Sequence, residues 1–165
     1  MNARIKLDLK RDRDVLGALM QLGATVRKSG LEKSLVFLLE VRASQINGCG
    51  YCIDMHTKDA RAAGESEQRL YLLSAWREAN ATVYTPRERA ALAWTEAVTR
   101  LDHQQVSDAV YESVRAHFNE QELLALTLAI AAINSWNRFN IAFQTPAGDY
   151  QPGSLSTFTK EISHA

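Results

Sequence analysis

Apolar side chains recur at helical spacing along most of the chain, and polar residues fill the positions between them. The first apolar set ends at Gly30 and consists of Val15, Leu16, Leu19, Leu22 and Val26. Glycine is typical just after a helix C-terminus, so this set predicts a helix over residues 13–28. Similar patterns predict helices over residues 32–46, 51–63, 66–80, 85–100, 107–118 and 119–143.

The fold class follows from these helices, because no long alternating segment indicates a strand. Capping residues mark two helix starts, at Thr85 with Glu88 and at Asn119 with Glu122. We expect an all-α fold: one domain over residues 1–165, built as a helical bundle of about six to seven helices. Residues 145–165 contain two prolines and two glycines and are expected to be irregular.

The predicted helix over residues 119–143 contains an unusually apolar stretch, residues 123–133. A helix that is apolar on every side must be enclosed by other helices, and a small domain encloses few of them. We therefore expect a homo-oligomer that buries part of this helix. The stretch is 11 residues long, well short of the roughly 20 that cross a bilayer, so no membrane span is expected.

Composition and charge narrow the classes of function. The chain has 165 residues, of which 46% are hydrophobic and 23% charged, as in one globular domain. Lys and Arg total 19 and so do Asp and Glu, which gives a net charge of zero. A neutral chain offers no net attraction to a phosphate backbone, so we expect no nucleic-acid partner. Residues 1–8 lack the apolar core of a secretory signal, and we expect a cytoplasmic protein.

The two cysteines of the chain, Cys49 and Cys52, are the candidate reactive residues. The predicted helix places Cys49 at or near a helix N-terminus, where unpaired amides favour a thiolate, and Cys52 in the first turn. His56 lies four residues after Cys52 and shares its helical face, so its imidazole can also favour a thiolate. Such a pair suits peroxide reduction, in which one thiolate becomes a sulfenic acid and the other thiol closes a disulfide.

A CxxC motif alone also fits other kinds of site. A thioredoxin-like fold would require a βαβ pattern, which the sequence lacks. A structural zinc site requires four ligands, whereas Cys49, Cys52 and His56 supply three. An inert pair of buried thiols is the remaining alternative.

The segment from residue 42 to residue 65, RASQINGCGYCIDMHTKDARAAGE, carries the most specific part of a resemblance to a known family. It resembles the signature of the carboxymuconolactone decarboxylase and alkylhydroperoxidase D-like superfamily, in the branch that carries CxxC followed by His. Similarity continues through residues 70–78, TPRERAALAWTEAVT at 85–99 and NSWNRF at 134–139, so it covers most of residues 30–143. The resemblance implies an all-helical homo-oligomer, commonly a trimer or hexamer, with thiol-dependent hydroperoxidase activity.

The resemblance also implies roles for single residues. Cys52 matches the cysteine that becomes the sulfenic acid, Cys49 its partner thiol, and His56 the histidine of a proton relay. The family usually places a glutamate twelve residues before the first cysteine, but that position is Phe37 here. Glu40, about one helical turn later, is the candidate to replace it.

The sequence departs from the family again at Tyr51, where well-studied members have a second histidine. The residues alone do not decide which thiol attacks, because the helix terminus stabilises a thiolate at Cys49 and the imidazole stabilises one at Cys52. We assign the attack to Cys52, on which the imidazole and the resemblance agree.

The resulting hypothesis is a cofactor-free, metal-free thiol peroxidase that acts on hydrogen peroxide or small organic hydroperoxides. An external dithiol would regenerate it, and the resemblance suggests a reductant of the lipoyl or thioredoxin type. Two alternatives stay open. One is a redox-sensing dithiol module without turnover, and the other is lactone decarboxylation, suggested by the superfamily name.

Overall fold

The computed structural model describes residues 2–102 and 105–154, and their regular structure is helical throughout. The α-helices are α1 (Arg13–Arg27), α2 (Lys33–Asn47), α3 (Gly50–Ala62), α4 (Glu67–Leu72), α5 (Pro86–Arg100), α6 (Asp108–Arg115) and α7 (Glu120–Ala142), with a 3-10 helix η1 (Leu73–Ala75) after α4. These segments contain no strand, and the predicted all-α fold is confirmed.

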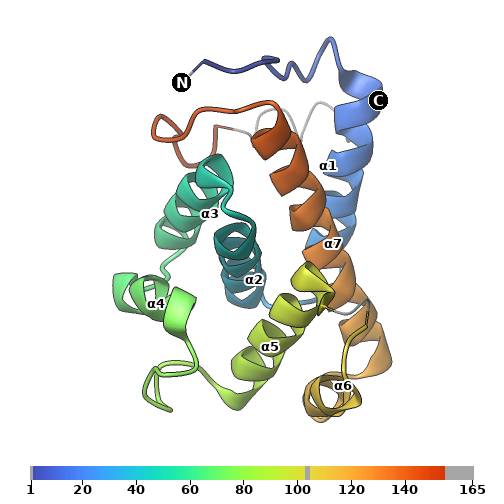
Figure 1. Cartoon of the computed structure of the whole chain (residues 1–165), viewed down its shortest axis with the longest axis vertical. Helices are drawn as coiled ribbons and strands as arrows, with labels where there is room; N and C mark the ends of the chain where they lie inside the picture. The colour runs from blue at the N-terminus through green and yellow to red at the C-terminus, as the bar shows by residue number, and fades with distance from the viewer. Residues whose placement is uncertain (1, 103–104, 155–165) are drawn as a thin grey trace.

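Helix α2 lies at the centre of the molecule and packs against α3, α5 and α7, while α1 runs along α7 (Figure 1). The apolar residues of α2 belong to two clusters. Leu35 and Leu39 pack in a cluster with residues of α5, α6 and α7. Leu38 and Val41 pack in a second cluster with residues of α3, η1 and α5. Because α2 contributes to both clusters, it is a fixed support for the turn that follows it.

Two predicted helices are shorter than the sequence indicated. In place of the helix expected over residues 66–80, the chain forms α4 and η1 and is no longer helical after Ala75. The Arg89 guanidinium donates hydrogen bonds to the carbonyls of Trp76, Ala79 and Asn80, where a longer helix would use backbone amides. The helix expected over residues 107–118 ends at Arg115, whose side chain donates to the carbonyl of Phe118. Arginine side chains thus replace helical amide donors at both ends.

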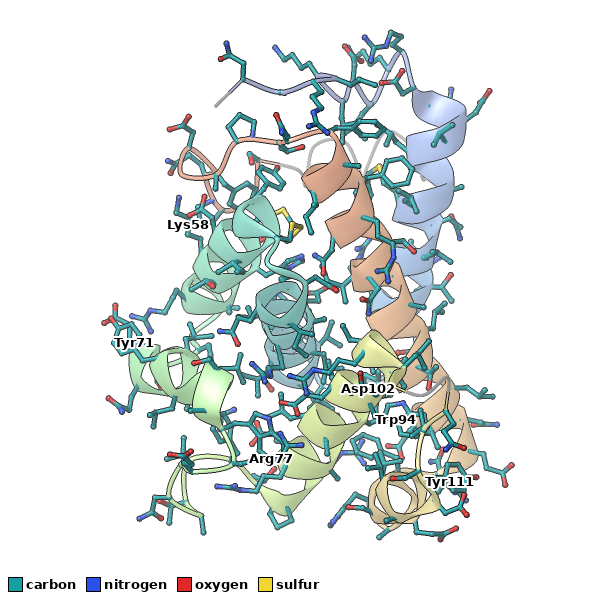
Figure 2. The ribbon with its side chains drawn as sticks, viewed as in Figure 1. Lys58, Tyr71, Arg77, Trp94, Asp102 and Tyr111 are labelled. Carbon is teal, nitrogen blue, oxygen red and sulfur yellow. A yellow bond between two sulfur atoms is a disulfide. The ribbon has the colours of Figure 1, made fainter. Side chains whose placement is uncertain are left out.

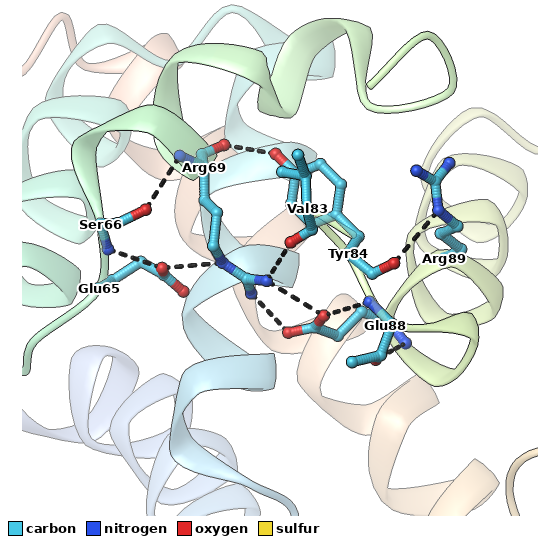
Figure 3. Close-up of polar contacts among 8 residues, drawn as sticks. Glu65, Ser66, Arg69, Val83, Tyr84, Glu88 and Arg89 are labelled. Carbon is cyan, nitrogen blue, oxygen red and sulfur yellow. Dashed lines mark hydrogen bonds and ion pairs between the residues drawn. The ribbon is translucent and has the colours of Figure 1, made fainter. Parts of the chain in front are cut away.

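Aromatic and charged contacts fix α5 among its neighbours. The rings of Trp94 on α5 and Tyr111 on α6 lie 6.3 Å apart (Figure 2). The guanidinium of Arg69 on α4 bonds to Glu65 at 2.9 Å, to Glu88 at 2.5 Å and to the Val83 carbonyl at 2.5 Å (Figure 3). Glu88 also closes the predicted capping box with Thr85, so one carboxylate starts α5 and attaches it to α4.

After α7 the described chain is irregular, as predicted, and residues 155–165 lie outside the described part. Residues 145–150, called the strap below, cross the N-terminal end of α3 in the same chain (Figure 1). None of the described helices combines the length and apolar character that a bilayer span requires.

Candidate functional site

The turn between α2 and α3 places the two cysteines. Gly48 ends α2 with φ of 71°, a left-handed conformation that glycine adopts at little cost. Cys49 is then the N-cap of α3, and its Sγ accepts the backbone N–H of Cys52 at 3.4 Å. The predicted positions of both cysteines, at the helix start and in its first turn, are confirmed.

Cys49 and Cys52 form a disulfide, with their Cα atoms 5.4 Å apart (Figure 2). Both residues are buried, with exposed fractions of 1% and 0%. They pack with Ala43 of α2 and Ile133 of α7. The disulfide is therefore enclosed between three helices, although it closes a ring of only a few residues.

On the same face of α3 as Cys52, the buried imidazole of His56 pairs with the partly buried carboxylate of Glu40 on α2. Glu40 Oε2 lies 3.0 Å from His56 Nδ1. Burial opposes protonation of the imidazole, but the Glu40 charge and hydrogen bond outweigh it and raise the pKa of His56 above its ordinary value. Because Glu40 holds Nδ1, Nε2 is the ring nitrogen left for proton transfer.

Phe37 occupies the position where the resemblance placed an acid, and its ring packs with the apolar cluster around Leu38. The structure thus brings Glu40, and not residue 37, to His56. Cys52 and His56 lie one turn apart on the same buried face of α3. In the described residues no hydrogen bond joins His56 to either sulfur, both of which are held in the disulfide.

A group of buried asparagines beside the cysteines was not among the predicted site residues. Asn47 at the end of α2 donates to the side-chain oxygens of Asn134 and Asn137 on α7, both at 2.8 Å. Asn137 donates in turn to Ser44 Oγ. One turn further along α7, Asn140 Nδ2 lies 3.5 Å from Cys52 Sγ and donates a hydrogen bond to it.

A signal for this group was present in the sequence. Asn134, Asn137 and Asn140 recur at intervals of three directly after the apolar stretch of residues 123–133, and such polar positions need partners when buried. In the structure Asn134 and Asn137 chiefly join α2 to α7 through side chains, and Asn140 is the residue that reaches a sulfur.

The strap covers the outer side of α3 next to the cysteines. Lys58 donates to the carbonyls of Gly148 and Tyr150, both at 3.0 Å, and forms an ion pair with Asp54 (Figure 2). The hydroxyl of Tyr150 bonds both oxygens of Asp59 at 3.0 Å. Its ring packs edge-on against Tyr51, one of the two residues between the cysteines.

Within the described residues, no group of three or more His, Cys, Asp or Glu side chains is arranged to hold a metal ion. The polar groups at the site instead contact the sulfurs and the imidazole. A buried disulfide at a helix start, backed by an imidazole and a carboxylate, can accept electrons from a dithiol and return as two thiols.

The fold and this site define an all-α, alkylhydroperoxidase D-like protein with a CxxC disulfide. The chain belongs to the carboxymuconolactone decarboxylase family, whose model matches residues 13–97.

Similar proteins support this assignment and differ in how far they are characterised. The uncharacterised protein YdfG of Bacillus subtilis (strain 168) is 44% identical over 124 residues, which cover 75% of this chain and 83% of YdfG. A protein of unknown function from Agrobacterium tumefaciens, provisionally named as the antioxidant defence protein AhpD, has a TM-score of 0.84 at 42% identity. The match covers 90% of this chain and all of that one. The debrominase Bmp8 shares the fold, with a TM-score of 0.76 at 17% identity and coverage of 93% and 79%.

Proposed function

We propose that the protein is a thiol-dependent peroxidase that reduces hydrogen peroxide or small organic hydroperoxides. The observation that carries this proposal is the Cys49–Cys52 disulfide backed by the Glu40–His56 pair. A dithiol that closes a disulfide within one helical turn can cycle without large movements of the fold.

The proposed cycle begins with reduced cysteines. The Cys52 thiolate attacks one peroxide oxygen, the O–O bond breaks, and the other oxygen leaves as an alcohol or water after taking a proton. His56 supplies that proton through Nε2, and Glu40 stabilises the charged imidazole. Cys52 is then a sulfenic acid. Cys49 attacks its sulfur, which releases water and forms the disulfide.

An external dithiol closes the cycle by exchange with the disulfide, giving two protein thiols and an oxidised reductant. A reductant of the lipoyl or thioredoxin type is part of the proposal, as is a homo-oligomeric assembly, trimeric or hexameric. Dihydrolipoamide and reduced thioredoxin, supplied in turn, distinguish the two reductants. Light scattering during size exclusion gives the subunit number.

The direct test measures peroxide consumption with excess dithiol. Wild-type protein should consume many equivalents, and Cys52→Ser should lose at least about a hundredfold of the rate because the nucleophile is gone. With peroxide but without dithiol, Cys49→Ser should accumulate a sulfenic acid that dimedone traps at Cys52. Equal turnover by Cys52→Ser and wild type would contradict the proposal.

The peroxide assay tests the redox-sensing alternative, and a separate assay of lactone decarboxylation tests the other. A redox-sensing module would consume about one equivalent of peroxide and then stop, with a change in its elution volume. A lactone decarboxylase would retain its rate in the Cys49→Ser and Cys52→Ser double variant.

A further inference from the structure

Asn140 is the one side chain outside α3 whose polar atom meets a cysteine sulfur in the described structure. Asn140 is buried, with an exposed fraction of 6%, and its Nδ2 donates a hydrogen bond to Cys52 Sγ at 3.5 Å. It lies in the last turn of α7, 88 residues from Cys52 in sequence. The contact therefore depends on the packing of α7 against α3.

The orientation of the Asn140 amide follows from a second hydrogen bond. The same Nδ2 donates to the backbone carbonyl of Trp136 at 3.0 Å. A flipped amide would place Oδ1 against that carbonyl and against the sulfur, which are both acceptors. The hydrogen-bond pattern therefore fixes the donor toward Cys52.

The two sulfurs have donors of different kinds. Cys49 Sγ, at the N-cap, accepts a backbone N–H of its own helix. Cys52 Sγ accepts an amide from another helix, and His56 lies one turn away from it on the same face. An N–H donor stabilises a thiolate more than a thiol, and burial makes such a bond stronger.

We propose that Asn140 stabilises the Cys52 thiolate in the reduced protein and so makes Cys52, and not Cys49, the attacking thiol. This inference rests on the proposed thiol cycle and adds a residue to it. The amide carries no charge and does not titrate, so its contribution persists above the pH at which His56 loses its proton. Asn140 and His56 thus support the same thiolate over different ranges of pH.

The test measures the thiol directly and needs no peroxide. In a Cys49→Ser background Cys52 is the sole thiol, and its rate of alkylation by iodoacetamide is followed by intact mass between about pH 5 and about pH 10. Asn140→Leu should move the midpoint of this profile upward by about one pH unit, which slows alkylation near neutral pH about tenfold. The rate at the alkaline plateau should change little.

Two controls separate a local effect from a general loss of packing. Asn137→Leu removes a buried amide one turn earlier on α7, which bonds Ser44 and Asn47 but neither sulfur. It should leave the midpoint in place. In a Cys52→Ser background, Asn140→Leu should leave the Cys49 profile unchanged. If Asn140→Leu does not fold by circular dichroism, Asn140→Ala takes its place.

An unchanged Cys52 midpoint in a folded Asn140 variant would overturn the inference, and so would equal shifts at Cys49 and Cys52. Because alkylation is independent of turnover, the outcome is distinct from that of the peroxidase assay. A protein that shows the shift but consumes no peroxide would retain the role of Asn140 and lose the proposed function.

Discussion

The imidazole of His56 is buried, and Glu40 acts on its charge more strongly than any other carboxylate, with a smaller effect from Asp59. Its pKa is raised in the folded protein because the Glu40 charge and hydrogen bond outweigh the effect of burial. A group with a raised folded pKa stabilises the fold below its ordinary value of about 6.5. This stabilisation is lost as the pH rises through the raised value.

Glu40→Gln should therefore lower the pKa of His56 and reduce the free energy of unfolding by about 1 kcal/mol in mildly acidic solution. The difference from wild type should shrink as the pH rises, because His56 becomes neutral in both proteins. Urea denaturation across this range measures the stability, and an NMR titration of the imidazole measures the pKa.

Glu112→Gln is a suitable control, since Glu112 is an exposed residue of α6. It should change neither quantity. A His56 pKa that is the same in Glu40→Gln and wild type would contradict the pairing.

At the scale of elements, a buried carboxylate holds the centre of the bundle together. Glu96 on α5 accepts from Arg42 of α2 at 2.7 and 2.9 Å and from the Trp76 indole at 2.8 Å, and it also pairs with Arg77. Its exposed fraction is 3%. Burial opposes ionisation, but the bonds from Trp76, Arg77 and Arg42 prevail and lower the pKa of Glu96.

Glu96→Gln should lower the free energy of unfolding by about 3 kcal/mol near neutral pH, because Arg42 remains buried without an anion. A lowered pKa stabilises the fold above the ordinary value for glutamate, so the loss should diminish as the pH falls through that lowered value. Denaturant unfolding at several pH values measures it. Glu78→Gln, an exposed change beside η1, should have almost no effect, and equal stabilities for the two variants would refute the role of Glu96.

The strap bonds to α3 next to the enclosed disulfide, and we expect it to limit how a reductant in solution reaches the sulfurs. Tyr150 attaches the strap to α3 through its bond to Asp59. Burial, and to a smaller extent this bond, raises the pKa of Tyr150 to about 12, so the hydroxyl stays protonated. Tyr150→Phe removes that bond, worth about 1 kcal/mol. If reduction proceeds through local opening of the strap, the phosphine TCEP should reduce the disulfide about fivefold faster.

Tyr71→Phe offers a matched control, since Tyr71 also bonds a carboxylate, Glu67, but on the exposed surface of α4. It should leave the reduction rate unchanged. If Tyr150→Phe and Tyr150→Ala were both reduced at the wild-type rate, the strap would not limit access.

Local signals in the sequence predicted local structure well. Capping at Thr85 and Asn119, the glycine at position 48 and the spacing from Cys52 to His56 each depend on residues within one or two turns. The early end of the helix predicted over residues 66–80 was missed because Arg89 bonds to its carbonyls from α5. The early end of the helix predicted over residues 107–118 depends on a local bond from Arg115 to Phe118, which the apolar spacing does not reveal. Asn140 and the partners of Glu96 were missed, like the contacts of Arg89, because packing alone brings them together.

At the scale of the whole molecule, the disulfide has too short a ring to act as a staple for the fold. Its cysteines are separated by 3 in sequence, and closing so small a loop removes little entropy from the unfolded chain. The chain-entropy relation gives about 2 kcal/mol, less than the loss expected for Glu96→Gln. The stability of the bundle must therefore come from its packed helices.

Reduction of the wild-type protein should accordingly leave its far-ultraviolet circular dichroism unchanged and lower the free energy of unfolding by at most about 2 kcal/mol. Denaturation with and without TCEP measures this difference, and the Cys49→Ser and Cys52→Ser double variant gives the reduced limit without a reductant. A large loss of helix on reduction would mean that the disulfide is structural. The proposed cycle requires that the fold persist on reduction, because the reduced protein must keep Glu40, His56 and Asn140 around Cys52 until peroxide binds.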